Sequence, residues 1–255
     1  MAVHRAGIAA AVLGATLLPA CSLLPAPEPP PEAADHFTDA DAVALAEAVA
    51  AGDADEVRRL VAEGADPDAK GLDERTVLQW AILTESDDGL VALLDVGADP
   101  NLNGVSGKTP LEDTVDIDTP TVVGERMIPL LLAGGADPSA QNAITGQAPL
   151  SVACVTSSDH AMQLLIDAGT DLDSADRNGG RALHACARGN RGAQLLVLLE
   201  AGADPEAVTS SGSTFQDYYF GYNREILNER ALAEREAVIA WLEEHGHEVI
   251  PKAYG

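Results

Sequence analysis

The chain has 255 residues, of which 46% are hydrophobic but only 4% aromatic, and its 41 acidic and 15 basic residues give a formal charge of −26. Such a surface repels nucleic-acid phosphates and anionic lipid headgroups, which argues against direct binding to either. It would steer a cationic protein toward the chain, although solubility or a saline habitat would explain the acidity equally well.

The first residues have the layout of an export signal. Arg5 precedes an apolar stretch, residues 6–18, that is too short to span a bilayer, and the stretch ends in Leu18-Pro19-Ala20-Cys21. This ending resembles the lipobox of bacterial lipoproteins, although Pro19 is unusual there. The resemblance implies a signal peptide over residues 1–20 and a diacylglycerol on Cys21. The alternative is ordinary signal-peptide cleavage with Cys21 incidental.

The resemblance also bears on location. Ser22 follows the cysteine where Asp would favour retention in the inner membrane, so we expect anchoring on the periplasmic face of an outer membrane if the cell has one. Residues 24–32 are rich in proline, which favours an extended spacer. We therefore assign residues 21–36 to a tether and expect folding to begin near Phe37.

From there two short signatures recur at one period. Gly-Ala-Asp-Pro begins at Gly64, Gly97, Gly135 and Gly202, with Gly-Thr-Asp-Leu at Gly169, so the glycines are 33, 38, 34 and 33 residues apart. A leucine-rich stretch precedes each of these four-residue signatures, which we call corners. The second signature is a Thr-Pro-Leu-like triplet that starts at 76, 109, 148, 181 and 214. A sustained period of this length indicates a repeat architecture.

One repeat can be interpreted physically. Thr109 can cap a helix, and Pro110 suits the first helical position. A short helix, a polar turn and a leucine-rich second helix follow, and the corner glycine can adopt the left-handed conformation that ends a helix. Neither helix can bury its apolar face alone, so neighbouring repeats must stack.

The residues Leu183-His184-Ala185-Cys186-Ala187 and the Gly-Ala-Asp-Pro corners resemble the ankyrin family. The resemblance runs from about Asp39 to Gly246. It implies an all-α solenoid of about six helix-turn-helix units with projecting hairpin loops. We assign the repeat domain to residues 37–246 and a tail to residues 247–255.

Three departures from the repeat are informative. The first unit, Asp39 to Pro67, has no hairpin or triplet, as expected of an amino-terminal cap. The third carries about five extra residues around positions 115–124. The sixth has a long second helix, expected over Glu225 to Glu244, which suits a carboxy-terminal cap.

No arrangement of residues suggests catalysis or a bound cofactor. There is no phosphate-binding glycine loop, nucleophile elbow or zinc-binding helix, and His245 and His247 alone make a poor metal site. The resemblance implies a structural role for His184, as a hydrogen-bonding link to neighbouring loops. Cys154 and Cys186 lie in adjacent first helices and could pair in an oxidising compartment. Their offset of one residue from the full repeat favours buried free thiols.

In the ankyrin family, partners are usually bound by hairpin tips and by exposed residues of the first helix. Alignment to the triplet places the following candidates at those positions: Leu72, Asp73, Arg75, Val105, Lys108, Ile144, Arg177, Asn178 and Arg188. Leu72, Val105 and Ile144 would form an apolar line unless other loops cover them.

A cluster of aromatic residues follows the last triplet. We expect Phe215 and Tyr219 to close the core and Tyr218 and Tyr222 to be exposed to a partner. Trp80 could serve either purpose.

These features predict a monomeric, non-catalytic protein-interaction module in a bacterial envelope, attached to the membrane through its lipid alone. Its partner would be another protein. Two more specific hypotheses remain open. One is an immunity protein that neutralises a toxin in the periplasm, and the other is a scaffold for an envelope or oxidative-stress enzyme.

Overall fold

A computed structural model describes residues 31–116, 121–156 and 159–250. Cys21, the signal segment, most of the tether and residues 251–255 lie outside these ranges, as do residues 117–120 of the predicted insertion. No helix in the described ranges is long and apolar enough to cross a membrane.

Over these ranges the chain folds into helices joined by turns and hairpin loops, with a single β-bridge between Lys70 and Thr76. The elements are α1 (Ala33–His36), α2 (Ala40–Ala51), α3 (Ala54–Glu63), α4 (Val77–Leu83), α5 (Asp87–Asp95), η1 (Val105–Gly107), α6 (Pro110–Thr114), α7 (Thr121–Ala133), α8 (Pro149–Thr156), α9 (Asp159–Asp167), α10 (Ala182–Arg188), α11 (Gly192–Ala201), α12 (Phe215–Tyr219), η2 (Arg224–Ile226) and α13 (Glu229–Glu244).

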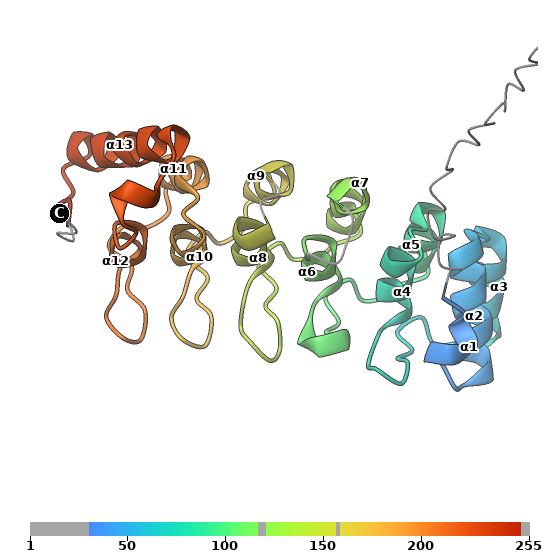
Figure 1. Cartoon of the computed structure of the whole chain (residues 1–255). Helices are drawn as coiled ribbons and strands as arrows, with labels where there is room; N and C mark the ends of the chain where they lie inside the picture. The colour runs from blue at the N-terminus through green and yellow to red at the C-terminus, as the bar shows by residue number, and fades with distance from the viewer. Residues whose placement is uncertain (1–30, 117–120, 157–158, 251–255) are drawn as a thin grey trace, which may run out of the picture. The chain divides into compact units, whose positions relative to one another are not determined.

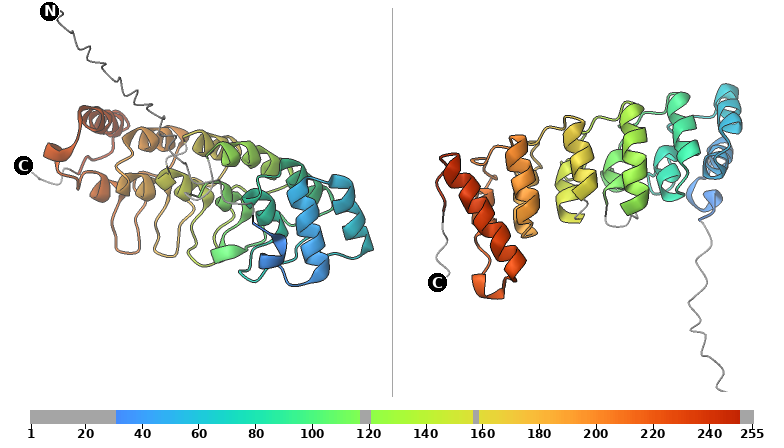
Figure 2. Two further views of the ribbon diagram at one scale, coloured as in Figure 1. Left: turned by 45° about the vertical axis from the view of Figure 1, so that its right-hand side comes forward. Right: turned by 90° about the horizontal axis from the view of Figure 1, so that it is seen from above.

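The helices form six antiparallel pairs, from α2–α3 (unit 1) to α12–α13 (unit 6), which stack in one row (Figures 1 and 2). The first helices of units 2 to 6, here called the inner helices, lie next to the hairpins, and the second helices form an outer row. Consecutive units pack against each other, so that α10 contacts both α8 and α12. This is the all-α ankyrin solenoid that the repeat predicted.

The local reasons for these helices are those expected from the triplets and the corner glycines. The hydroxyl oxygens of Thr76 and Thr109 accept the N–H groups of Gln79 and Glu112, each at 3.1 Å, and cap α4 and α6. At the other end of a unit, Gly202 has φ 101° and terminates α11 in the left-handed conformation.

A ladder of hydrogen bonds joins successive corners. The backbone N–H of Asp99 donates to Asp68 Oδ1, that of Asp137 to Asn101 Oδ1, and that of Asp171 to Ser139 Oγ, each at 2.7 Å. Many of the aspartate and asparagine side chains are therefore used in building the stack.

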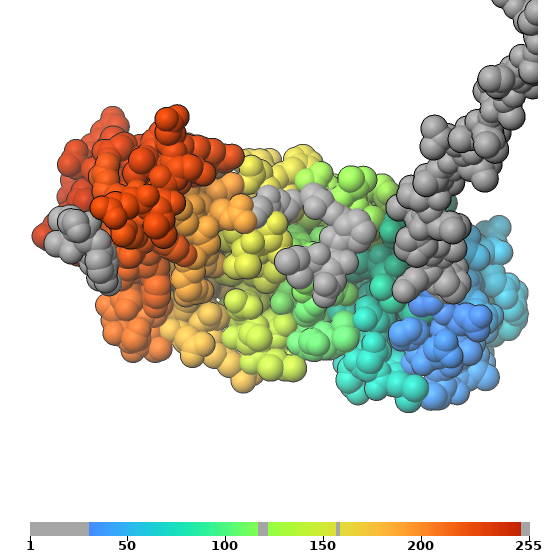
Figure 3. Space-filling model, in the orientation of Figure 1, coloured from blue at the N-terminus to red at the C-terminus, as the bar shows by residue number. Residues whose placement is uncertain are grey.

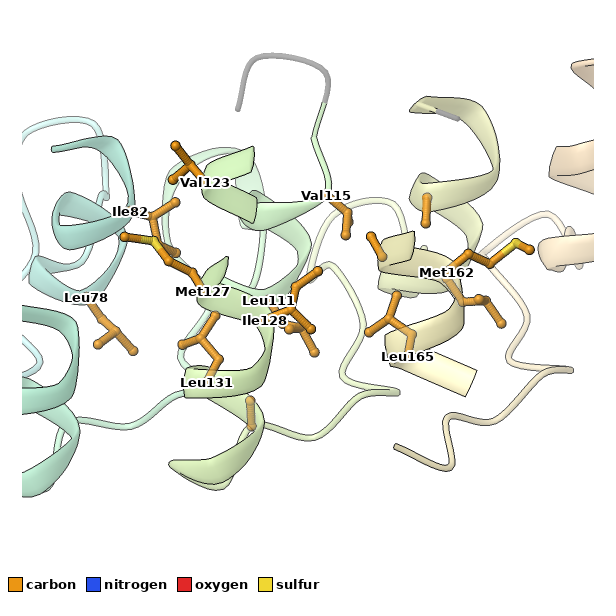
Figure 4. Close-up of a cluster of buried hydrophobic side chains, with 14 of the residues drawn as sticks. Leu78, Ile82, Leu111, Val115, Val123, Met127, Ile128, Leu131, Met162 and Leu165 are labelled. Atoms are coloured by element: carbon orange, nitrogen blue, oxygen red, sulfur yellow. The ribbon is translucent and has the colours of Figure 1, made fainter. Parts of the chain in front are cut away.

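The core runs continuously along the row. Leu111 from α6 lies beside Ile128 of α7, and Met127 reaches back toward Ile82 of α4 (Figure 4). Leu111, Met127 and Ile128 are at most 1% exposed. In the space-filling view the units form a continuous surface (Figure 3). Burial of apolar side chains between neighbours is what holds a repeat array together.

The amino-terminal cap begins a few residues before Phe37. Ala33–His36 forms a helical turn within the segment that we assigned to the tether, and Ala33 and Phe37 are 5% and 1% exposed. Phe37 packs edge-on against Trp80, with ring centroids 5.7 Å apart. Trp80 is fully buried, and its indole N–H donates to the Ala46 carbonyl at 3.0 Å, so this residue belongs to the core.

The carboxy-terminal cap extends past residue 246. Its long helix α13 begins at Glu229 rather than Glu225, because residues 224–226 form a separate 3₁₀ turn and Asn228 caps the helix. Beyond the helix, the His247 ring stacks on Trp241, and the Ile250 N–H donates to Gln216 Oε1 at 2.9 Å.

Cys154 of α8 and Cys186 of α10 form a disulfide, with their Cα atoms 4.9 Å apart. The expectation of free thiols was wrong for a geometric reason. Two stacked, parallel helices present opposite faces to each other, so identical repeat positions point the same way and do not meet. The one-residue offset brings the two sulfurs together.

Candidate protein-binding surface

The hairpin tips carry exposed apolar side chains. Leu72 is 70% exposed and Ile144 59% exposed, whereas Val105 is half-buried and its N–H donates to Gln79 Oε1 at 3.1 Å. Of the predicted apolar line, Leu72 and Ile144 are thus open to solvent, and Val105 is partly covered. Backbone hydrogen bonds hold neighbouring hairpins in register, such as Ala143 N–H to Gly107 O at 2.8 Å.

The charged tip residues of units 2 and 3 are engaged inside the chain. Arg75 lies 3.4 Å from an Asp73 carboxylate oxygen and 3.8 Å from one of Asp113. Lys108 lies 3.7 Å from Asp113 and also pairs with Asp116. The charges of Asp73, Arg75 and Lys108 are therefore compensated by neighbouring residues.

Beneath this network, a buried carboxylate joins units 3 and 4. Glu112 is 4% exposed, and burial raises its pKa to about 7. Asn142 donates to both of its carboxylate oxygens, at 3.0 and 3.1 Å. The Asn142 side-chain oxygen accepts the backbone N–H of Ile144 at 2.8 Å, so Glu112 helps to support the exposed tip.

Sequence reasoning did not single out Glu112, although a signal was present. In unit 3 it occupies the position that His184 occupies in unit 5, directly after the triplet. His184 accepts the Arg181 N–H at Nδ1 and lies 3.2 Å from the Ser213 carbonyl through Nε2. This is the loop-bridging role expected for His184, and burial lowers its pKa.

At unit 5 the tip changes character. Arg177 is exposed at the position equivalent to Ile144, and its guanidinium donates to the Ala143 carbonyl of the preceding hairpin. Asn178 is exposed beside it, and its carbonyl accepts the Ser210 N–H at 2.8 Å. The exposed hairpin tips are therefore apolar in units 2 and 4 and polar and cationic in unit 5.

The aromatic cluster has a buried part and a part at the surface. Its two predicted core residues are buried. Phe215 and Tyr219 are 1% and 0% exposed. Tyr218 and Tyr222 are half-buried rather than fully exposed. With Arg188, Asp217 and Gly221 they line an open pocket of ≈ 450 Å³.

Arg188 and the two tyrosines are in direct contact. The Arg188 guanidinium carbon lies 5.4 Å from the centroid of the Tyr218 ring. The Tyr222 hydroxyl donates to the Arg188 carbonyl. The structure therefore brings together three residues that sequence reasoning placed separately on a helix and in an aromatic run.

The described residues include no group of three or more His, Cys, Asp or Glu side chains placed to hold a metal ion. What the surface offers is exposed apolar side chains at the tips and a tyrosine-lined pocket with an arginine. These features suit contact with another macromolecule.

Comparison with known proteins supports the fold. The family model described as ankyrin repeats (3 copies) matches residues 123–209. Protein PhlB of Serratia liquefaciens is 30% identical over 171 residues, which cover 67% of this chain and 73% of that protein. The E3 ubiquitin-protein ligase KEG of Arabidopsis thaliana is 26% identical over 195 residues, covering 60% of this chain but 12% of its own length.

A third relative, the SH3 and multiple ankyrin repeat domains protein 2 of Homo sapiens, is 35% identical over 85 residues, which are 5% of its length. Because the similarity covers only a small part of these two longer proteins, it shows a shared repeat and nothing about their activities. With the recurrent triplets, the stacked helix pairs and the extended similarity to PhlB, this chain belongs to the ankyrin-repeat family.

Proposed function

We propose that this protein is displayed in a bacterial cell envelope by a lipid on Cys21 and binds a partner protein through its hairpin face. We define the hairpin face as the tips together with the exposed side of the inner helices. Ankyrin repeats form protein-protein interaction modules and are in general non-catalytic. The exposed apolar tips, Leu72 and Ile144, carry the proposal for the site.

Further apolar side chains extend this surface. Leu83 at the end of α4 is 42% exposed, and Val155 near the end of α8 is 58% exposed. Exposed apolar side chains gathered on one face of a soluble domain mark an interaction surface. The framework beneath is pre-organised by the corner ladder and by side-chain bridges such as Glu112–Asn142, which lowers the entropic cost of binding.

Two features support export. The first 21 residues have the lipoprotein-signal layout, and the Cys154–Cys186 disulfide suits an oxidising compartment, because cytosolic thiols are kept reduced. The similarity to a Serratia protein over most of its length is consistent with a bacterial setting.

Site-specific photo-crosslinking in intact cells tests the binding face. A photoreactive phenylalanine would replace Leu72 or Ile144, with Val91 on the outer helix α5 as the control, because Val91 is also an exposed apolar residue at 39%. We expect one specific adduct from both tips and none from position 91. Equal adducts from all three positions would refute the assignment of the face.

Lipid attachment is tested separately. Metabolic labelling with a fatty-acid probe should mark the wild-type protein and leave Cys21→Ala unlabelled. Equal labelling of the two proteins would refute the anchor.

The identity of the crosslinked partner decides between the two finer roles. A toxin whose action in the periplasm is relieved by co-expression would indicate an immunity protein. An envelope or oxidative-stress enzyme that co-purifies with the chain would indicate a scaffold. The net charge of −26 favours a cationic partner in either case.

A further inference from the structure

Basic side chains are distributed unevenly over the described part of the chain. Most of them have a carboxylate oxygen within 4.0 Å: Arg58, Arg59, Lys70, Arg75, Lys108, Arg126, Arg224 and Arg230. Arg235 is buried and donates to backbone carbonyls instead. The remaining arginines, at positions 177, 181, 188 and 191, all lie in unit 5, and the described part of the chain shows no carboxylate ion pair for any of them.

This concentration is unexpected in a chain with 41 acidic and 15 basic residues. With so many carboxylates available, surface arginines easily find a partner, as those of units 1 to 3 do. Arg177 and Arg181 still use their guanidinium groups on backbone carbonyls, of Ala143 and of Asp173 respectively. Arg188 is exposed, and its guanidinium lies against the Tyr218 ring, with Asp217 and Tyr222 lining the same pocket.

The surroundings of Arg188 form an open pocket lined by aromatic side chains. Its guanidinium faces the Tyr218 ring at the edge of the 450 Å³ pocket, and the Tyr222 hydroxyl binds its backbone carbonyl. Stacking on an aromatic face leaves the in-plane N–H donors of a guanidinium free for a carboxylate. Asp217 also lines the pocket, but its carboxylate accepts the Thr214 N–H at 2.9 Å at the start of α12.

The capping helix α13 stabilises this pocket through backbone hydrogen bonds. Arg235 of α13 donates through Nη2 to the Tyr219 carbonyl at 2.9 Å and through Nη1 to the Tyr222 carbonyl at 3.2 Å. These bonds hold the turn that carries both pocket tyrosines. A pocket whose walls are already fixed binds with a smaller loss of conformational entropy.

We propose that the Arg188–Tyr218–Tyr222 pocket receives a glutamate or aspartate side chain from a surface loop of the partner protein. The proposal rests on the protein-binding function above and specifies the chemistry of one contact. A carboxylate pairs with the Arg188 donors in a charge-assisted, bidentate geometry, and an adjacent apolar side chain packs on the tyrosines. Because the rest of this chain is strongly acidic, a partner carboxylate is repelled over most of the surface and attracted at this pocket. The pocket therefore determines how the partner protein is oriented and which partners can bind.

Binding of a short peptide to the whole exported chain tests the proposal. The probe is acetyl-Gly-Leu-Glu-Leu-Gly-amide, in which the glutamate side chain supplies the one carboxylate. Matched arms replace Glu by Gln or Lys, and a further arm keeps Gln but has a free carboxy terminus. Nuclear magnetic resonance follows the Arg188 Nε–H and the tyrosine ring signals.

We expect the Glu peptide to shift these signals with a dissociation constant on the order of 1 mM, and the Gln peptide to bind about tenfold more weakly. Arg188→Gln should abolish the difference between the two peptides. Arg191→Gln is the matched control, because it removes the same charge from the same unit and should leave the difference intact.

Tighter binding of the Lys peptide, or equal binding of the Glu peptide to wild type and Arg188→Gln, would overturn the proposal. Binding of the free-terminus peptide in place of the Glu peptide would also overturn it, since the carboxylate would then come from a chain end. These outcomes leave the crosslinks at Leu72 and Ile144 unaffected, whereas failure of the protein-binding function removes those crosslinks whatever the peptide does.

Discussion

Units 2 and 3 use their basic side chains for a different purpose than unit 5 does. Near the amino-terminal hairpins, Arg75 and Lys108 both pair with Asp113, so their charges are compensated within the fold. In unit 5, Arg177 and Arg188 are exposed and have no carboxylate partner in the described part of the chain. The repeat fixes where a side chain stands, and its neighbours decide whether its charge is available to a partner.

The apolar tips show the complementary trend. Leu72 and Ile144 are exposed in units 2 and 4, and Arg177 takes the equivalent place in unit 5. One hairpin face therefore combines an apolar half with a cationic and aromatic half. The following predictions test how far the two halves differ, from the largest expected effect to the smallest.

Removal of the disulfide should destabilise unit 5 and its neighbour more than units 1 and 2. The Cys154–Cys186 bridge closes a loop of 32 residues, which corresponds to about 3–4 kcal/mol of free energy of unfolding. Urea denaturation of the double variant Cys154→Ser/Cys186→Ser should show this loss. The wild type under reducing conditions serves as the control, and amide exchange should quicken first in α8 and α10. Equal quickening in α2 and α4 would contradict a local effect.

The residue directly after the triplet should contribute about equally to the free energy of unfolding in the two halves, as Gln79 in unit 2 and as His184 in unit 5. Gln79 accepts the N–H groups of Thr76 and Val105 and is fully buried, and His184 bridges its hairpin to the next one. Replacing either by alanine leaves buried polar groups unpaired and should cost about 1–3 kcal/mol in denaturant unfolding. His184→Gln should retain most of the stability, because Gln79 already does this work in unit 2. If His184→Gln lost as much stability as His184→Ala, Gln79 and His184 would not be playing the same role.

Glu112 should make the stability of the amino-terminal half depend on pH near neutrality. Because burial raises the folded-state pKa of Glu112 to about 7, above the ordinary value of 4.5, the unfolded chain releases this proton more readily. The free energy of unfolding therefore falls as pH rises from 4.5 through 7 and is level above that.

Glu112→Gln removes this dependence. The stability gain of the variant over wild type should be greater at about pH 8 than at about pH 5.5, by about 2 kcal/mol. The neighbouring Asp113 is present in both proteins and cancels in the comparison. Parallel pH profiles for the two proteins would show that Glu112 is not the group responsible.

A smaller effect concerns the tip backbone. Glu74 has φ 66°, whereas the equivalent positions of the next hairpins are Gly107, Gly146 and Gly179, with φ of 72–74°. Glu74→Gly should relieve the left-handed strain and raise the free energy of unfolding by about 0.5 kcal/mol, after the entropic cost of glycine. The reciprocal change Gly179→Ala should destabilise, because its Cβ would lie 2.8 Å from the Ser210 nitrogen. A loss on Glu74→Gly would show that the Lys70–Glu74 ion pair outweighs the strain.

Much of the fold follows from the sequence, because each repeat carries its own local signals. The Thr109-Pro110 start, the left-handed corner glycines and the leucine-rich second helices specify one unit, and a recurring period requires that the units stack. The end caps are less regular, and their helices do not follow the repeat pattern. The tether ends in a helical turn at Ala33–His36, and α13 begins at Glu229 because Asn228 caps it.

The candidate site divides in the same way. Alignment to the triplets placed Leu72, Ile144, Arg177 and Arg188 at exposed positions, because a repeat position keeps its orientation in every unit. Which of the charged residues is free depends on side chains that other repeats contribute. Only the tertiary structure decided that Arg75 and Lys108 share Asp113, that Asn142 covers Glu112, and that Cys154 meets Cys186. Except for Lys108 and Asp113, these contacts join residues thirty or more positions apart. The period of the sequence does not determine which side chains meet between two units.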